Sequence, residues 1–179
     1  MLIKNIVKHF ILITKHKYKV FILCTKAGIP IRGLLHDLSK YSPTEFFESV
    51  KYYNGKYSPI ANCKKENGYS KAWLHHFGRN KHHHEYWYDY GAPEPTPVIP
   101  YKYTVEMICD GLAAGMVYQG KKWTKEYQLE YWNNKKSHLK INNKIIKVLD
   151  EVFNEVALKG VNKVITKKHL KEVYYKYVK

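Results

Sequence analysis

Histidine is the most distinctive residue type in this sequence. Ten of the 179 residues are histidine, and half of those ten lie within residues 75–84. His16 and the adjacent pair His36-Asp37 precede this cluster, and Asp110 follows it. Neutral imidazole is the commonest transition-metal ligand, and carboxylates are common partners for it. Nitrogen and oxygen donors that arrive from several helices can build a divalent-metal site inside a helical bundle.

The histidines of the cluster occur as neighbours, which bears on how many can bind one ion. Adjacent residues on a helix point about 100° apart, so each doublet is expected to supply one ligand and one supporting residue. The sequence leaves open which member of His75/His76 and of His82/His83 is the ligand. His84 is the member of the triplet expected to face solvent.

This order of residues resembles the HD-domain superfamily of metal-dependent phosphohydrolases, which are all-helical and bind metal through a His, a His-Asp doublet and a later Asp. The resemblance covers roughly residues 9–132, and HDLSK (36–40) looks like the HDxxK form of members with two or three metals. More closely, the chain looks like a small, uncharacterised family of bacterial and phage proteins without an established substrate. The segments that carry this closer resemblance are HDLSKYSPTEFFESVKYYNG, GYSKAWLHHFGRNKHHHEYW and PYKYTVEMICDGLAAGMVYQG.

The resemblance implies a ligand set. His16, His36, Asp37 and Asp110 would form the basic metal site, and Asp37 would bridge to a second metal. One of His75/His76 and one of His82/His83 would complete that second site. His9 competes with His16, but His16 lies 20 residues before the doublet, close enough for a helical hairpin to return beside it. The implied cofactor is one or two divalent ions, namely Mn, Fe, Ni, Co or Zn, with Mg as a further candidate.

Three residues are candidates for the chemistry itself: Asp37, Lys40 and Glu106. Lys40 lies three positions after Asp37 and would share its face on a helix. It is expected either to hold a phosphate oxygen or to neutralise Asp37. Glu106 lies one turn before Asp110 and can orient a ligand, accept a proton or pair with a neighbouring lysine.

Substrate-binding candidates lie at the break between the two histidine-bearing segments. Arg79 and Lys81 flank Asn80 there, a good position for contacts to an anion. The alternative for these residues is solvated loop charge.

Hydrophobic periodicity and helix start and stop signals predict an all-α fold, an HD-like bundle. Residues 1–135 are expected to form the metal-binding domain, with 136–179 as a basic helical extension packed on it. Ser42-Pro43-Thr44-Glu45 matches a capping box with proline at the first helical position. One short helix is expected to include residues 34–38, and residues 91–100 are expected to form a loop. The other expected helices span about 3–26, 43–53, 59–67, 71–77, 82–87, 101–118, 125–133, 143–158 and 167–177.

The charge balance indicates polyanionic partners. Thirty-one Lys+Arg against 15 Asp+Glu give a net charge of +16, which attracts nucleotides and nucleic acid; a lysine-rich genome is the alternative explanation. The three separated cysteines form no disulfide framework and favour a reducing cytoplasm. The N-terminus is interrupted by lysine and histidine and is expected to be an amphipathic helix, so we expect no membrane partner.

Three functions are compatible with these features. The first is a metal-dependent phosphohydrolase that acts on a nucleotide or another phosphorylated small molecule through metal-activated water. The second is a di-iron oxygenase, since one branch of the same superfamily uses a similar site with dioxygen. The third is a non-enzymatic protein that binds nucleic acid or a nucleotide and keeps the metal for stability.

Overall fold

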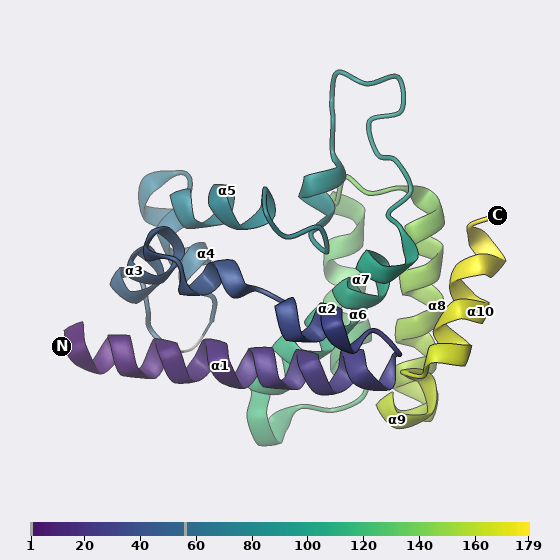
Figure 1. Ribbon diagram of the computed structural model, residues 1–179, viewed down its shortest axis with the longest axis horizontal. Helices are drawn as coiled ribbons and strands as arrows, with labels where there is room; N and C mark the ends of the chain where they lie inside the picture. Colours follow the sequence, from purple (N-terminus) through teal and green to yellow (C-terminus); the bar gives the residue numbers. More distant parts are fainter. Residues whose placement is uncertain (1, 56) are drawn as a thin grey trace.

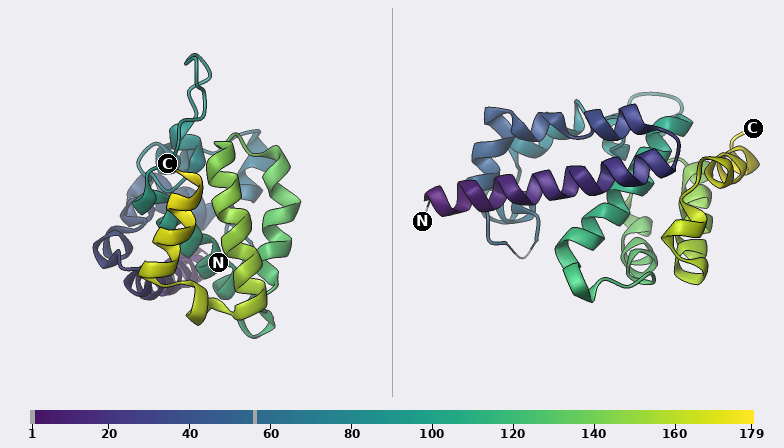
Figure 2. Two further views of the ribbon diagram at one scale, coloured as in Figure 1. Left: turned by 90° about the vertical axis from the view of Figure 1, so that its right-hand side faces the viewer. Right: turned by 60° about the horizontal axis from the view of Figure 1, so that its bottom comes forward.

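The long first helix, α1 (Leu2–Lys26), organises the molecule. The computed structural model describes residues 2–55 and 57–179, and within these residues every regular element is helical (Figures 1 and 2). The all-α prediction is confirmed. The chain folds back along α1 through α2 (Pro30–Leu35) and then builds a small group of short helices beside the N-terminal half of α1. These are the 3₁₀ helix η1 (Leu38–Tyr41), α3 (Pro43–Lys51), α4 (Pro59–Asn67) and α5 (Lys71–Phe77).

The second half of the chain packs against the C-terminal half of α1. A 3₁₀ turn, η2 (His84–Trp87), leads into a proline-containing loop that projects from the top of the molecule in Figure 1. The helix α6 (Tyr101–Gln119) then crosses α1. The remaining elements are η3 (Gly120–Lys122), α7 (Tyr127–Lys135), η4 (Lys136–His138), α8 (Asn143–Lys159), α9 (Val161–Val164) and α10 (Lys167–Tyr177).

The buried face of α1 carries polar side chains in its N-terminal half and apolar side chains in its C-terminal half. Towards the N-terminus this face buries His9 and His16, and towards the C-terminus it buries Val20 and Leu23. The apolar half belongs to a core that continues through α6, α8 and α10. Burial of apolar side chains there provides the main stabilisation of the fold and leaves the polar half of α1 available for a site.

The C-terminal helices are part of this same core. Leu149 of α8 and Leu170 of α10 are each only 1% exposed and pack in one cluster with Val20 and Ile108. None of the described helices is long and apolar enough to cross a membrane.

Two short segments differ from the predicted helices, and both carry site residues. The helix expected over 34–38 ends at Leu35, and Asp37 has a left-handed backbone with φ 52°. Aspartate tolerates this conformation better than most residues, although it remains strained. The segment expected to be helical from His82 is a turn followed by η2 from His84. Because neither doublet lies on a regular helix, both of its side chains can point inward.

The predicted capping box forms only in part. The Ser42 hydroxyl accepts a hydrogen bond from the Glu45 backbone N–H at 3.5 Å. The reciprocal bond is not needed, because the Ser42 N–H donates to the carbonyl of Ser39 at 2.9 Å. The Glu45 carboxylate is therefore available for other partners.

Close contact between α1 and α2 fixes the start of the His36-Asp37 segment. A Cβ atom on Gly33 would lie 2.7 Å from Cys24 Cβ and 2.9 Å from the Phe21 Cα. These distances are too short for a methyl group, so only glycine permits this approach. Lys17 reinforces the contact by donating hydrogen bonds to the carbonyl oxygens of Leu34 and His36.

We expect Gly33→Ala to destabilise the protein by about 1–3 kcal/mol, the usual cost of overpacking a close contact. The helix α2 would have to shift, and metal binding should weaken as well because His36 and Asp37 follow α2 directly. Thermal unfolding checks the first effect. Gly91→Ala is the matched control, since its nearest neighbour would lie 3.6 Å away, in ordinary contact. Equal melting temperatures for the two variants would contradict this account.

Candidate metal centre

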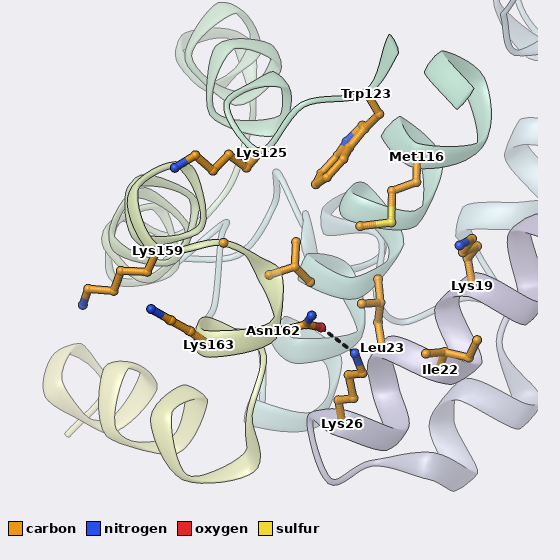
Figure 3. A pocket seen from close by; sticks show the side chains of 12 residues that line it. Lys19, Ile22, Leu23, Lys26, Met116, Trp123, Lys125, Lys159, Asn162 and Lys163 are labelled. Carbon is orange, nitrogen blue, oxygen red and sulfur yellow. Dashed lines mark hydrogen bonds between the residues drawn. The ribbon is translucent and has the colours of Figure 1, made fainter. Parts of the chain in front are cut away.

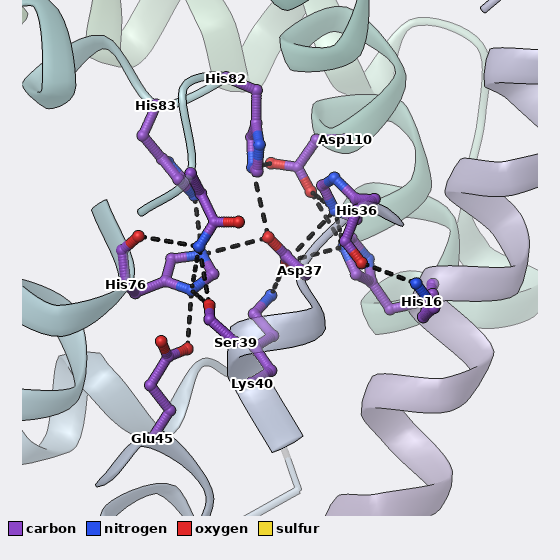
Figure 4. A network of polar contacts seen from close by, with 12 residues as sticks. His16, His36, Asp37, Ser39, Lys40, Glu45, His76, His82, His83 and Asp110 are labelled. Atoms are coloured by element: carbon purple, nitrogen blue, oxygen red, sulfur yellow. Dashed lines mark hydrogen bonds and ion pairs between the residues drawn. The ribbon is translucent and has the colours of Figure 1, made fainter. Parts of the chain in front are cut away.

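The Asp37 carboxylate lies at the centre of a buried cluster of imidazoles (Figure 4). Its Oδ2 atom is 3.2 Å from His36 Nε2 and 4.0 Å from His16 Nε2. Asp110 Oδ1 joins them, 2.9 Å from His16 Nε2 and 3.4 Å from His36 Nε2. His16, His36, Asp37 and Asp110 thus present four donor atoms within 4.8 Å of one another, a group that can hold a metal ion.

The other oxygen of Asp37 faces a second group of donors. Asp37 Oδ1 lies 3.3 Å from His76 Nε2 and 3.5 Å from His82 Nε2. His83 completes the group, with its Nε2 2.9 Å from His76 Nε2. Each half of one carboxylate therefore belongs to a different set of nitrogen and oxygen donors.

Two features of the cluster match the needs of a cation. The Nε2 atoms of His76 and His83 face each other, as do those of His16 and His36 at 3.4 Å. A cation shared by their lone pairs would satisfy both atoms of each pair. His82 is 1% exposed, and its Nε2 atom makes no hydrogen bond. Buried polar atoms normally have partners, so this atom indicates a ligand.

Glu106 orients the imidazoles from behind the first group. Glu106 is completely buried. Its Oε1 atom accepts a hydrogen bond from His36 Nδ1 at 3.1 Å and lies 3.4 Å from His82 Nδ1. Arg32 holds the other oxygen through Nε at 2.8 Å and Nη2 at 2.6 Å. A carboxylate on Nδ1 leaves the Nε2 lone pair directed at the metal position, as in many metal sites. Glu106 is thus a positioning residue, and its cationic partner is Arg32.

Glu45 has the same role behind the second group. Its Oε2 accepts from His76 Nδ1 at 2.7 Å, and its Oε1 accepts from His75 Nδ1 at 2.6 Å. His75 therefore belongs to the supporting shell and His76 to the donor group. The expected division of this doublet into one ligand and one supporting residue matches this arrangement.

The electrostatics of the cluster favour charged carboxylates. Burial raises the pKa of Glu106, but the contacts of its carboxylate with His36 and His82 outweigh burial and lower its pKa to about 2. For Asp37, burial is likewise outweighed by the charges of His36 and Lys40, and its pKa is well below the ordinary value. For His36 the carboxylates overcome burial and raise the pKa well above the ordinary value. The site thus attracts positive charge.

Lys40 and Asp110 are only partly buried, as is His83 of the second donor group. The Lys40 side chain is 28% exposed and that of Asp110 22%, whereas His36 and Asp37 are fully enclosed. Lys40 Nζ lies 2.5 Å from Asp37 Oδ2. Burial lowers the pKa of Lys40, but the charges of Asp37 and Asp110 outweigh burial and raise it. A substrate that enters beside Asp110 would therefore meet a permanent cation.

The three substrate-binding candidates after α5 do not converge on the donor atoms. Asn80 is buried and donates to Ser39 Oγ and to the His76 carbonyl, both at 2.8 Å. Lys81 lies over the ring of Tyr86, 5.3 Å from its centroid. Arg79 is at the surface, with Nη1 3.4 Å from the His75 carbonyl oxygen. Asn80 links two site-bearing segments, while the two cations are directed elsewhere.

The remaining histidines separate clearly from the donor groups. His9 shares the buried face of α1 with His16 but packs against the rings of Phe46 and Tyr53. Burial and the charge of Lys40 lower the His9 pKa to about 4, so it is neutral at pH 7. His84 Nδ1 lies 3.0 Å from Glu85 Oε2 and is not a member of either group.

Glu45 and Arg32 are the site residues that the sequence analysis did not identify. Glu45 matched a helix-capping motif, which concealed its contact with histidines 30 and 31 residues away. Arg32 carried a usable signal, since only Arg32 and Arg79 of the 31 basic residues are arginine. In a chain that otherwise uses lysine, an arginine indicates a planar, two-pronged contact such as that with Glu106.

Comparison with known proteins places the chain in a family without assigning its activity. Residues 5–155 match the model of a family of unknown function, DUF5662, and the chain belongs to that family. The match includes every residue of the two donor groups and ends within α8. No curated protein and no solved structure matches the chain.

We expect the purified protein to carry at least about half an equivalent of a divalent transition metal, as a partly occupied histidine and carboxylate site would. Asp37→Ala should lose most of this metal because Asp37 contributes to both groups. His84→Ala is the control, since His84 lies outside them. Elemental analysis measures all three proteins. Background metal in the wild type, or equal metal in Asp37→Ala, would contradict the assignment.

We also expect Arg32→Ala to weaken metal binding by about 10- to 100-fold, the usual effect of losing a partner that orients ligands. Without Arg32 the Glu106 carboxylate loses its charged partner and holds His36 and His82 less firmly. Arg79→Ala removes the other arginine, which does not contact Glu106, and should change the affinity little. Competition with a metal-binding dye measures both. Equal affinities would show that Glu106 is oriented without Arg32.

Proposed function

We propose that this protein is a metal-dependent phosphohydrolase that acts on a nucleotide or another phosphoester, with two divalent ions bound on either side of Asp37. The observation that carries the proposal is the division of one buried carboxylate between two donor groups, with the Lys40 ammonium beside it. Divalent ions in such a site lower the pKa of bound water and polarise phosphoryl oxygens. The resemblance to the HD-domain superfamily supports the same reaction class.

The donor set supports ions of the Mn, Fe, Co, Ni and Zn series over Mg. Five of the seven residues in the two groups are histidines, and imidazole nitrogen suits transition metals, whereas Mg prefers oxygen ligands. Neutral Nε2 atoms are the donors on each imidazole. Glu45 and Glu106 accept from Nδ1 and direct Nε2 toward the metal position, where a bound ion would replace any Nε2 proton.

Lys40 is the residue placed to recognise a phosphoryl group. An ammonium donates hydrogen bonds only and cannot ligate a metal, so its role must be directed at an anion. In the structure that anion is Asp37. With a substrate present, Lys40 can turn to a phosphoryl oxygen near Asp110 and offset charge that develops there.

We expect Lys40→Met to lower the turnover of a responsive phosphoester by about 10²-fold or more, the scale for losing one preorganised electrostatic contact. The methionine keeps an apolar stem and the bound ions balance the Asp37 charge, so the metal content and melting temperature of the metal-loaded protein should change little. His36→Ala should lose metal, stability and activity together, because a metal bound only to the folded state stabilises it. The measurements are phosphoester turnover with each divalent ion supplied, metal content and thermal unfolding.

Other outcomes of these measurements would overturn parts of the proposal. If Lys40→Met loses metal and stability like His36→Ala, Lys40 serves only to neutralise Asp37. If the wild type cleaves no phosphoester with any divalent ion, the phosphohydrolase assignment fails. Consumption of dioxygen by anaerobically prepared, iron-loaded protein would then favour the di-iron oxygenase.

A further inference from the structure

The positive charge of this protein is least compensated along its first helix. Residues 1–36 contain six lysines and one arginine and no acidic residue, since Asp37 is the first acid in the sequence. Three lysines of the C-terminal half, in contrast, pair with acids. Lys136 lies 2.8 Å from Asp150, Lys176 lies 2.6 Å from Glu151, and Lys159 pairs with Glu155.

Five lysines of α1 form a line along one side of the helix. They are separated by four or seven residues, which returns each of them to nearly the same angle around the helix axis. All five side chains are exposed. At a rise of about 1.5 Å per residue the line is about 33 Å long. We call it the lysine track, and it consists of Lys4, Lys8, Lys15, Lys19 and Lys26.

Two hollows border the lysine track, and each contains an aromatic side chain. The first has a volume of about 540 Å³ and is lined by Lys8, Lys15 and Tyr53, among others. The second has a volume of about 580 Å³, and Trp123 and Met116 line it beside Lys19 and Lys26 (Figure 3). Three further lysines from the C-terminal half surround the second hollow, namely Lys125, Lys159 and Lys163.

The first hollow lies next to the candidate metal centre. Lys15 directly precedes His16 in the sequence, and Leu12, which also lines the hollow, lies one turn before His16 on α1. On the opposite wall, Val117 lies two turns after Asp110 on α6. Residues that line the first hollow therefore lie within two helical turns, about 10 Å along the helix axis, of the candidate ligands His16 and Asp110.

We propose that the lysine track binds the phosphate backbone of a single-stranded nucleic acid, with bases placed in the two hollows. A cationic groove combined with aromatic surfaces for stacking is the usual way in which proteins bind single strands. The length of the track corresponds to about ten nucleotides at the roughly 3.4 Å spacing of a stacked strand. Binding of the strand is independent of the proposed hydrolysis. The further idea that the bound strand is a substrate cleaved near Asp110 rests on the proposed function.

The geometry favours nucleic acid over an anionic lipid surface. The exposed apolar side chains of α1 include Leu2, Ile3 and Phe10. At 3.6 residues per turn they lie roughly 130–150° around the helix axis from the mean direction of the lysines. A flat membrane that contacts the lysine track would therefore leave these side chains in water, whereas lipid binding by a helix requires both kinds of contact.

The test is the affinity of a fluorescent 15-nucleotide oligo(dT) at several salt concentrations, measured by anisotropy in the presence of a chelator. The variant Lys8→Ala/Lys15→Ala/Lys19→Ala removes exposed lysines that have no hydrogen bond or ion pair within the described residues. The control Lys65→Ala/Lys168→Ala/Lys171→Ala removes three exposed lysines elsewhere, so both variants lose the same charge. The chelator prevents metal-dependent cleavage, so a failure of the proposed hydrolysis does not affect the result.

We expect the track variant to bind at least about tenfold more weakly than the control at low salt. The slope of log affinity against log salt should fall by about 2, since each phosphate contact contributes about 0.7. Equal affinities and slopes for the two variants would overturn the proposal. A second result would also overturn it: the wild type binds vesicles that contain phosphatidylserine more tightly than it binds the oligonucleotide, and the track variant loses this preference for vesicles.

Discussion

The buried charge of Asp37 is the constraint around which the rest of this structure is arranged. An isolated carboxylate taken out of water costs several kcal/mol, so a folded chain must supply compensating charge and hydrogen bonds. Here the compensation comes from Lys40 and from imidazoles on α1, at the end of α2, on α5 and in the turn before η2. Each of these elements is anchored in turn, α2 by the Gly33 contact with α1 and α5 by Glu45. The left-handed backbone of Asp37 accompanies the placement of its carboxylate between the two donor groups.

The helices α1 and α6 each carry both apolar core residues and metal-site residues, which explains how a chain of this size accommodates such a polar cluster. Both helices bury apolar residues at their crossing, where Val20 and Ile108 pack with α8 and α10. The same helices carry His16 and Asp110 beside that core. The apolar packing holds the helices in fixed positions, and the donors gain their geometry from it. The C-terminal helices thus support the site without contributing a ligand.

The sequence predicted the helical class, most helix boundaries and the set of donor types, because periodicity and spacing are local properties. It also favoured His16 over His9, and His16 is the one that joins a donor group. The roles of His75, Arg79 and Lys81 could not be predicted. At the end of a helix the direction of a side chain depends on tertiary contacts, such as that of Asn80 with Ser39. Both His82 and His83 reach the same group because their segment is a turn, which helical periodicity could not reveal. Glu45 was read from a local motif, although its partners are distant in sequence.

The central claim is that two ions bind on opposite sides of one carboxylate. Crystals grown with Mn²⁺ or Zn²⁺ and measured at the absorption edge of that metal test this claim most directly. The account predicts two anomalous peaks, one among His16, His36 and Asp110 and one among His76, His82 and His83, with Asp37 between them. A map without a peak beside Asp37, or with peaks only at exposed histidines, would contradict it.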